Sequence, residues 1–113
     1  MKKISIMLNK DCQNAYVSHE MLKFNMANIF GGVTLYECSG IWYDNKGIEY
    51  SDDNIEYVSY CTDYKPDLKT FYTGRLEYIL ERLIKNCQEN CIMYTVDNKA
   101  YFYDKDNTIV NIE

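Results

Sequence analysis

The fold is decided by the stretch GGVTLYECSGIWYDNKGI, which runs from Gly31 to Ile48. The two leading glycines predict the end of a helix, because glycine reverses the backbone there at the least steric cost. Residues 33–43 alternate as in a long strand, with Gly40 as a bulge. The turn residues 44–47 predict a hairpin. The return strand is expected to begin at Ile48 and, past a polar kink at 52–54, to continue over 55–61.

Helices are predicted on both sides of this hairpin. The first spans residues 18–30, with Ser18 as its N-cap, and the second spans residues 68–89. The second is marked by a single apolar stripe, formed by Leu76, Ile79, Leu80, Leu83, Ile84 and Cys87. Residues 4–8 read as an inner strand. Residues 91–96 and 99–103 read as a C-terminal hairpin around Asp97 and Asn98, and residues 108–112 as either an edge strand or a tail exchanged with a partner.

This order of elements predicts the α+β class with a ferredoxin-like, split β-α-β architecture. Two helices are expected on one face of an antiparallel sheet, with an extra C-terminal hairpin. The other face is left uncovered. Since tyrosine has an apolar body and a polar tip, the twelve tyrosines predict a homodimer or higher oligomer through that face.

Length and charge limit the possible functions. The 113 residues suit one domain, expected to span residues 1–113. Twelve basic and seventeen acidic residues give a net charge of -5 without a basic stripe, which argues against direct nucleic-acid binding. No apolar run is long enough to span a membrane, and no signal peptide is apparent, so we expect a cytoplasmic protein. Five cysteines, an odd number, are expected to be free thiols.

No arrangement of residues predicts catalysis. The Gly-rich phosphate loops and nucleophile motifs of known enzyme classes are absent from the sequence. The single histidine, His19, is expected to be solvated in the first turn of a helix. The acidic pair Asp52 and Asp53 is interpreted as turn residues and lacks the oxygen ligands of a calcium site. The sequence therefore predicts no metal, no cofactor and no enzymatic activity.

A binding site is the remaining hypothesis. The backbone amides of Gly31, Gly32 and Thr34 are candidates for receiving a phosphate. Arg75, early in the second helix, is a candidate for gripping one in a fork geometry. Base-stacking rings are expected from Tyr36, Trp42 and Tyr57. Packing alone also explains each of these residues, so both interpretations stay open at the level of sequence.

The stretch Phe30–Ile48 resembles a motif of small uncharacterised bacterial and phage proteins of ferredoxin-like type. Its elements are F-x-G-x-T, then G-x-W-x-D, then x-x-G, carried here by Phe30, Gly32 and Thr34, by Gly40, Trp42 and Asp44, and by Gly47. The resemblance implies the fold and carries no catalytic residue across.

By analogy with phage proteins of this size, the chain looks like an anti-defence protein, active in the host cytoplasm if phage-encoded. We expect a non-catalytic sponge that sequesters a cyclic nucleotide-type immune signal as its small-molecule ligand. The alternative is an anti-CRISPR-like inhibitor, whose acidic surface docks on a host defence protein.

Overall fold

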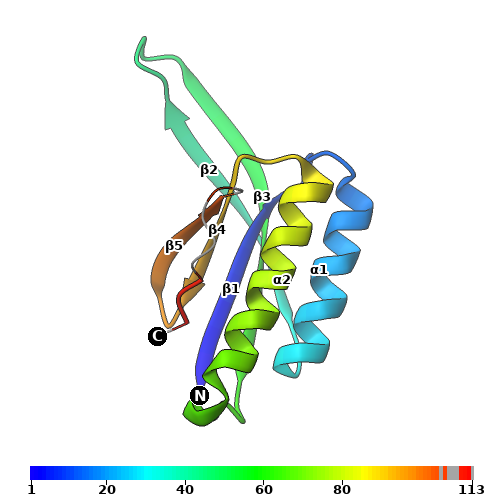
Figure 1. Ribbon diagram of the computed structural model, residues 1–113. Coiled ribbons are helices and arrows are strands. Elements are labelled where there is room, and N and C mark those ends of the chain that lie inside the picture. The colour runs from blue at the N-terminus through cyan, green and yellow to red at the C-terminus, as the bar shows by residue number, and fades with distance from the viewer. Residues whose placement is uncertain (105, 107–109, 113) are drawn as a thin grey trace.

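The computed structural model describes residues 1–104, 106 and 110–112. The chain forms β1 (Lys2–Asn9), α1 (Ala15–Phe30), β2 (Thr34–Tyr43), β3 (Glu49–Cys61), a short 3-10 turn (Pro66–Leu68), α2 (Lys69–Cys87), β4 (Cys91–Val96) and β5 (Lys99–Asp104) (Figure 1). The strands form one sheet in the order β2-β3-β1-β4-β5, and all neighbours are antiparallel. The predicted α+β, ferredoxin-like class and the extra C-terminal hairpin are confirmed.

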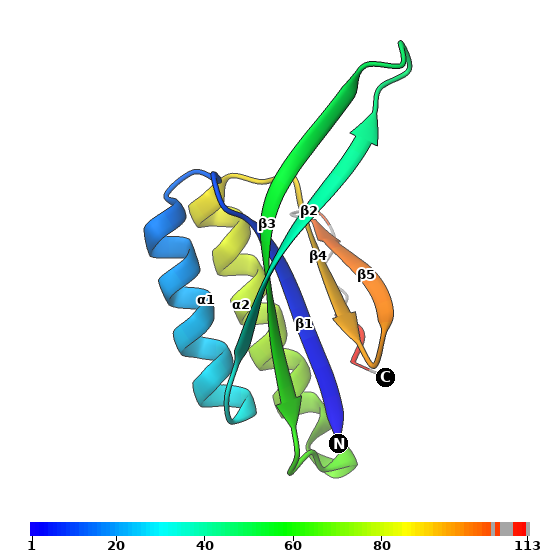
Figure 2. The ribbon, with the colours of Figure 1, turned by 180° about the vertical axis from the view of Figure 1, so that it is seen from behind.

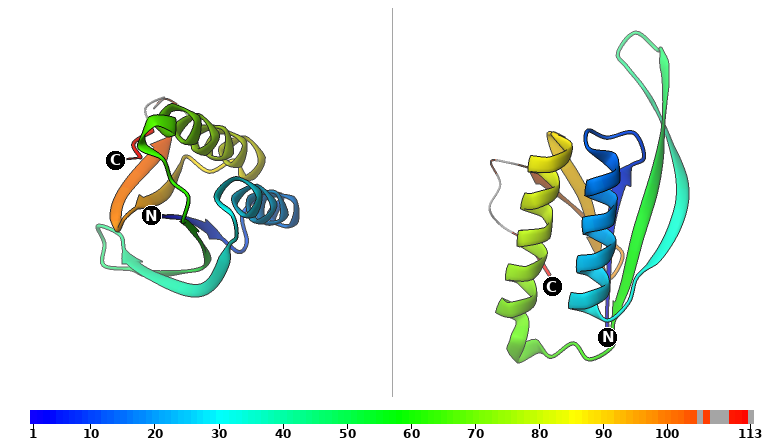
Figure 3. Two further views of the ribbon diagram at one scale, coloured as in Figure 1. Left: turned by 90° about the horizontal axis from the view of Figure 1, so that it is seen from below. Right: turned by 90° about the vertical axis from the view of Figure 1, so that its right-hand side faces the viewer.

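Both helices cover the same face of the sheet (Figures 1 and 3). The core lies between the two layers, where Ile4, Ile6 and Leu8 of β1 are buried together with the apolar stripe of α2. Burial of such side chains contributes about 1.5–3 kcal/mol each. The single apolar stripe predicted for the second helix is confirmed. Among the described residues, no helix has the length and apolar character needed to cross a membrane.

Helix α1 starts earlier than predicted. Its N-cap is Asn14, in the left-handed conformation with φ 53, and the expected cap, Ser18, lies inside the helix. Ser18 is fully buried, and its hydroxyl has no hydrogen-bond partner among the described residues. The predicted end of the helix is confirmed: Gly31 has φ 90, and its N–H donates to the carbonyl of Ala27.

The hairpin of β2 and β3 is more regular than predicted. Its pairing runs without interruption from Thr34 opposite Val58 to Tyr43 opposite Glu49. Gly40 pairs with Asp52 in this register, so the expected bulge at Gly40 and kink at 52–54 are both wrong. Turn chemistry had suggested a break there, but cross-strand hydrogen bonding keeps these polar residues in an extended strand.

The far end of this hairpin projects from the body of the protein. Strand β1 pairs with β3 only as far as Asn9 opposite Asn54. Beyond that level β2 and β3 have only each other as neighbours, and we call this two-stranded segment, residues 40–52, the arm. It extends past the helices and the other strands (Figures 1 and 2) and gives the molecule extents of 48 × 25 × 23 Å.

The register assigns each strand residue to a face. Tyr57 of β3 is 2% exposed and contacts His19 of α1, so odd-numbered residues of β3 face the helices. Because side chains alternate, even-numbered residues of β2 and β3 point to the opposite side. We call that side, which no helix covers, the open face.

The C-terminal end differs from the sequence expectation. Residues 110–112 form no strand, and Val110 and Ile112 are buried in the core of the same chain. The rest of the expected edge strand or exchanged tail, residues 108 and 109, lies outside the described residues.

Candidate functional site: an acidic hollow on the open face

A hollow of about 400 Å³ lies where β1 ends between β3 and β4. Its lining includes Met7, Asn9, Asp52, Asn54, Glu89 and Met93. The strand β3 supplies two of these side chains, and β1 and β4 supply a methionine each. No lysine or arginine is among the described residues that line it. The hollow is therefore acidic, and the thioether side chains of Met7 and Met93 form part of its lining.

Strand geometry explains the polar side of this hollow. Asp52, Asn54 and Glu56 follow one another at every second position of β3, so all three point to the open face and are half-buried. The carboxylate of Asp52 accepts a hydrogen bond from Nε1 of Trp42, with a distance of 3.2 Å. The carboxylates of Asp52 and Glu89, together with nearby Glu56, favour a cationic ligand over a phosphate.

Asn9 is fixed from the helix side of the sheet. Its backbone carbonyl lies 2.9 Å from Nε2 of His19, and Nδ1 of the same ring lies 2.6 Å from the hydroxyl of Tyr57. The side chain of Asn9 accepts from the backbone N–H of Asp11 at 2.7 Å. His19 is half-buried with both ring nitrogens engaged, so the expectation of a solvated histidine is wrong. The ring is held because the end of β1 brings a carbonyl against α1.

All five cysteine side chains are free thiols. Burial raises the pKa of the Cys12 thiol to about 11, and burial likewise raises the pKa of Cys87. Since the thiolate is the nucleophile, these two groups are poorly reactive at neutral pH. Cys91 is exposed and lies at the hollow.

Two of the predicted stacking rings, those of Tyr36 and Trp42, share the open face. Tyr36 is 50% exposed and Trp42 is 49% exposed. The Trp42 ring stacks on Tyr50 with centroids 4.4 Å apart and an angle of 14° between the planes. Through its hydrogen bond to Asp52, Trp42 is tied to the acidic hollow.

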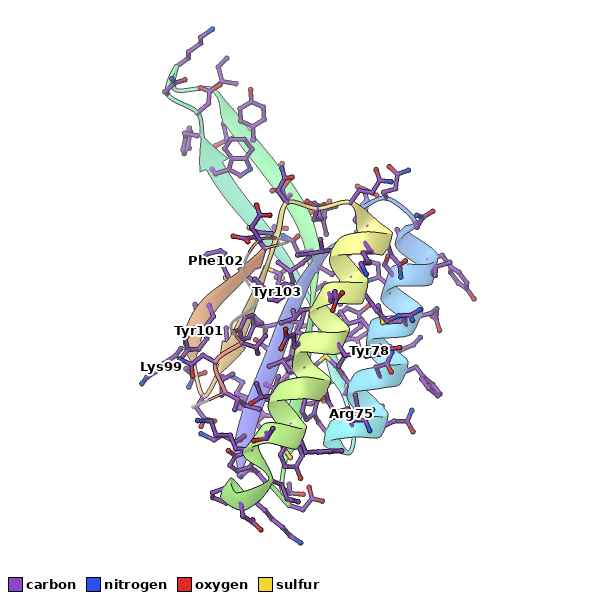
Figure 4. All side chains as sticks on the ribbon, in the orientation of Figure 1. Arg75, Tyr78, Lys99, Tyr101, Phe102 and Tyr103 are labelled. Carbon is purple, nitrogen blue, oxygen red and sulfur yellow. The ribbon has the colours of Figure 1, made fainter. Side chains whose placement is uncertain are left out.

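The other predicted residues lie elsewhere. Tyr57 is buried on the helix side, so its ring offers no stacking surface. Arg75 lies on α2, in the helical layer, with its guanidinium 5.0 Å from the centroid of the Phe71 ring (Figure 4). The segment Gly31, Gly32 and Thr34 borders a small hollow of about 190 Å³ with Tyr60, at the other end of β3 from the arm. The structure does not bring the seven predicted residues together.

Sequence reasoning missed Asn9, Asn54 and Glu89, and it interpreted Asp52 as a turn residue. The missed signal is the spacing of Asp52, Asn54 and Glu56. Polar residues at every second position mark one face of a continuous strand, whereas the assumed kink hid this alternation.

No protein-family model and no curated protein sequence matches this chain. Solved structures do. A phage SAM lyase in complex with S-methyl-5'-thioadenosine matches with a TM-score of 0.62 and 7% sequence identity, covering 93% of this chain and 90% of that chain. A phage SAM lyase in the apo state matches with a TM-score of 0.59 and 12% identity, covering 93% and 88%. This chain shares the fold of a phage SAM lyase.

A DUF3240 family protein from Shewanella baltica has a TM-score of only 0.41 at 10% identity. The resemblance to phage proteins that the sequence indicated is supported at the level of fold by the match to a phage SAM lyase. The motif itself has no support, because no family model matches this chain.

These matches correct the functional expectation. The prediction of a non-catalytic cyclic-nucleotide sponge, and that of a protein without enzymatic activity, are contradicted because both phage neighbours are lyases. The alternative prediction, an anti-CRISPR-like inhibitor, is contradicted for the same reason, because such an inhibitor is also non-catalytic. Electrostatics agrees, since carboxylates rather than cations line the hollow on the open face and repel the phosphates of a cyclic nucleotide.

Proposed function

We propose that this protein binds S-adenosylmethionine (SAM) in the acidic hollow of the open face and cleaves it, releasing S-methyl-5'-thioadenosine. The observation that carries the proposal is the acidic hollow, with Asp52 and Glu89 in its wall, in a fold shared with a phage SAM lyase. At neutral pH SAM has a cationic sulfonium, a cationic ammonium and one carboxylate. Such a ligand suits a cation-free acidic hollow in a protein of net charge -5.

The reaction breaks the bond between the sulfonium sulfur and Cγ of the methionine part. The bonding electron pair stays on sulfur, which leaves as the neutral thioether of S-methyl-5'-thioadenosine. A carboxylate oxygen of the same SAM molecule attacks Cγ and forms homoserine lactone, so no water and no proton enter or leave. This route requires no nucleophile, acid or base from the protein. It explains how a lyase can lack the motifs sought in the sequence.

The groups of SAM that lose their charge during the reaction and the group that keeps it require different surroundings, so the residues that line the hollow have different roles. The sulfonium and the attacking carboxylate both lose charge in the transition state, so they react faster where they are poorly hydrated. The walls formed by Met7 and Met93 supply that apolar contact. The ammonium keeps its charge throughout, and Asp52 and Glu89 are the groups that would hold it. Holding an unchanged charge is uniform binding, which lowers KM rather than raising kcat.

Tyr36 stays in the proposal as the ring on which the adenine stacks, because it is half exposed on the same face. Such stacking contributes about 1–3 kcal/mol. Trp42 is assigned a different role here, orienting Asp52 through its indole N–H. An anti-defence role remains part of the proposal: removal of SAM would deprive SAM-dependent defence enzymes of their substrate.

The test is incubation of the protein with SAM, with chromatography and mass spectrometry of the products. We expect S-methyl-5'-thioadenosine and homoserine lactone in equal amounts. Asp52→Asn and Glu89→Gln should each raise KM about 10- to 100-fold with a smaller effect on kcat, since a charge-assisted hydrogen bond contributes about 1.5–3 kcal/mol.

The matched control is Glu81→Gln, which removes an exposed carboxylate of α2 that pairs with Lys85. Its kinetics should equal those of the wild-type protein. Intact SAM after prolonged incubation would contradict the proposed activity. Turnover that Asp52→Asn and Glu89→Gln leave unchanged would move the site away from this hollow.

A further inference from the structure

Asn9 and Asn54 lie side by side on the open face. Asn9 is the last residue of β1, and the register places it opposite Asn54 of β3. One position further along, the N–H of Lys10 donates to the carbonyl of Asp53 at 2.9 Å. Because hydrogen-bonded and non-hydrogen-bonded pairs alternate in an antiparallel ladder, Asn9 and Asn54 form a non-hydrogen-bonded pair, the kind whose side chains are closer. Both side chains line the acidic hollow.

The amide of Asn9 is oriented by two contacts. Its side-chain oxygen accepts from the N–H of Asp11 at 2.7 Å, and its backbone carbonyl lies 2.9 Å from Nε2 of His19. Since the oxygen belongs to this turn, the end of the side chain that remains for a ligand is the NH₂ group. The NH₂ group of Asn54 makes one long hydrogen bond, of 3.4 Å, to the carbonyl of Asp52. Each NH₂ group carries two donors, so both amides can donate to a ligand as well.

These two amides are the only side-chain N–H donors among the described residues that line the hollow. The other polar side chains of this lining are the carboxylates of Asp52 and Glu89 and the thiol of Cys91. A carboxylate repels an anionic group, and a thiol is only a weak donor. An anionic group in this hollow is therefore best held at Asn9 and Asn54.

We propose that Asn9 and Asn54 together bind the carboxylate of an amino acid whose ammonium is held by Asp52 and Glu89. This subsite rests on the proposed function, in which the amino acid is the methionine part of SAM. Asp52 and Asn54 are successive residues on one face of β3, about 7 Å apart, which suits an ammonium and a carboxylate on one carbon. Asn9 donates from the neighbouring strand, about 4.8 Å away, and so draws the carboxylate toward β1 and away from the carboxylates of β3.

Neutral donors suit a carboxylate that has to react. In the proposed reaction one carboxylate oxygen forms the bond to Cγ while the bond between Cγ and sulfur breaks, and that electron pair stays on sulfur. The carboxylate loses its charge in this step, so a paired lysine or arginine would stabilise the reactant more than the transition state. A neutral amide binds a carboxylate less strongly than a cation does. The role of the two asparagines is therefore to orient the carboxylate toward Cγ.

The test compares two ligands that do not form the lactone. S-adenosylhomocysteine has the ammonium and the carboxylate but no sulfonium, whereas decarboxylated SAM has the ammonium and the sulfonium but no carboxylate. Asn9→Asp keeps the acceptor for the Asp11 N–H and removes the donor. In titration calorimetry it should weaken binding of S-adenosylhomocysteine about 10- to 100-fold. It should bind decarboxylated SAM at least as tightly as the wild-type protein does, because the added carboxylate attracts a cation.

A second variant changes no charge, and turnover gives a second measurement. Asn54→Leu should also weaken binding of S-adenosylhomocysteine and leave that of decarboxylated SAM unchanged. At saturating SAM it should lower kcat about tenfold or more, because the carboxylate is no longer aimed at Cγ. Asp52→Asn, in contrast, should mainly raise KM. The matched control is Asn45→Asp, an exposed asparagine in the turn of the arm, which should leave both affinities and kcat unchanged.

The outcomes separate this subsite from the proposed activity. If the wild-type protein cleaves SAM but the variants affect both ligands equally, or neither, the carboxylate subsite is wrong and the activity stands. If the variants weaken only S-adenosylhomocysteine but the wild-type protein leaves SAM intact, the subsite is supported and the lyase activity is wrong. A wild-type protein that binds neither ligand would overturn both.

Discussion

Among single residues, His19 connects the two layers of the protein. The tautomer with its proton on Nε2 satisfies both contacts: Nε2–H donates to the carbonyl of Asn9, and Nδ1 accepts from the hydroxyl of Tyr57. Asn9 lines the acidic hollow, whereas Tyr57 belongs to the core. Through this one ring the end of β1 is held against α1, which positions a wall of the candidate site.

Burial at this contact predicts alkaline sensitivity. Burial raises the pKa of Tyr57 from 10.0 to about 12 and that of Cys12 from 9.0 to about 11. Both groups are neutral in the folded protein, so their contribution to stability is complete below pH 9. It is lost as the pH rises through the folded-state pKa values. We expect urea denaturation to show a free energy of unfolding that falls between pH 9 and 12, with roughly 2 kcal/mol from Tyr57.

The variant Tyr57→Phe serves as the comparison, because it removes the titrating hydroxyl and keeps the ring. It should be less stable at pH 8, since Nδ1 of His19 loses its donor. Above pH 10 it should lose stability less steeply than the wild-type protein. Parallel curves for the two proteins would contradict the assignment to Tyr57.

At the scale of elements, the turn of the arm is organised by one carboxylate. Asp44 accepts hydrogen bonds from the backbone N–H groups of Lys46 at 2.8 Å and Ile48 at 3.0 Å, and from the Tyr50 hydroxyl at 3.2 Å. The hydrogen bond from the Ile48 N–H is the main reason that the pKa of Asp44 lies below its ordinary 3.8. The ionised carboxylate therefore stabilises the turn.

Asp44→Ala is expected to loosen the arm. The amide protons of Lys46 and Ile48 should exchange with solvent faster, because both lose their acceptor. Since the pKa is lowered in the folded turn, the protection by Asp44 is complete above pH 3.8 and is lost as the pH falls below it. Asp67→Ala, an exposed carboxylate far along the chain, is the control and should leave these two amides unchanged. Equal exchange in Asp44→Ala and wild type would show that the turn is held by its backbone alone.

At the scale of the whole molecule, the C-terminal residues complete the core. Ile112 is 1% exposed, and the N–H of Asn111 donates to the hydroxyl of Tyr94 at 2.9 Å. These contacts join the chain end to β4, whose residues pack beneath the helices. Residues 110–112 are therefore packed in the fold of their own chain, which argues against an exchanged tail for this part of the expected segment.

Ile112→Ala should lower the free energy of unfolding by about 2–4 kcal/mol, because it removes buried methyl groups and leaves a cavity. Val17→Ala is the control, since Val17 is an exposed aliphatic residue of α1, and it should change stability by less than about 0.5 kcal/mol. Both are compared by urea denaturation at one protein concentration. An equal effect of the two variants would mean that the chain end is not packed in solution.

Local patterns in the sequence were enough to predict α2, the turn at Asp44 to Gly47, the helix end at Gly31 and the C-terminal hairpin. Each depends on residues close together in the chain, such as the apolar stripe that begins at Leu76. Polar residues within a strand were the weak point. Asp52 and Asn54 have turn propensity. Pairing with β2 keeps both residues extended, and Asn54 also pairs with β1.

The candidate site was decided by tertiary structure. Periodicity indicates which residues share a face, yet it does not indicate which face the helices cover. Tyr36 and Tyr57 looked equivalent in the sequence, but the packing of α1 exposes the first and buries the second. The acidic hollow likewise depends on β1 lying between β3 and β4. Asn9, Asp52 and Glu89 are far apart in the chain, and long-range strand pairing, which no local pattern encodes, is what brings them to one place.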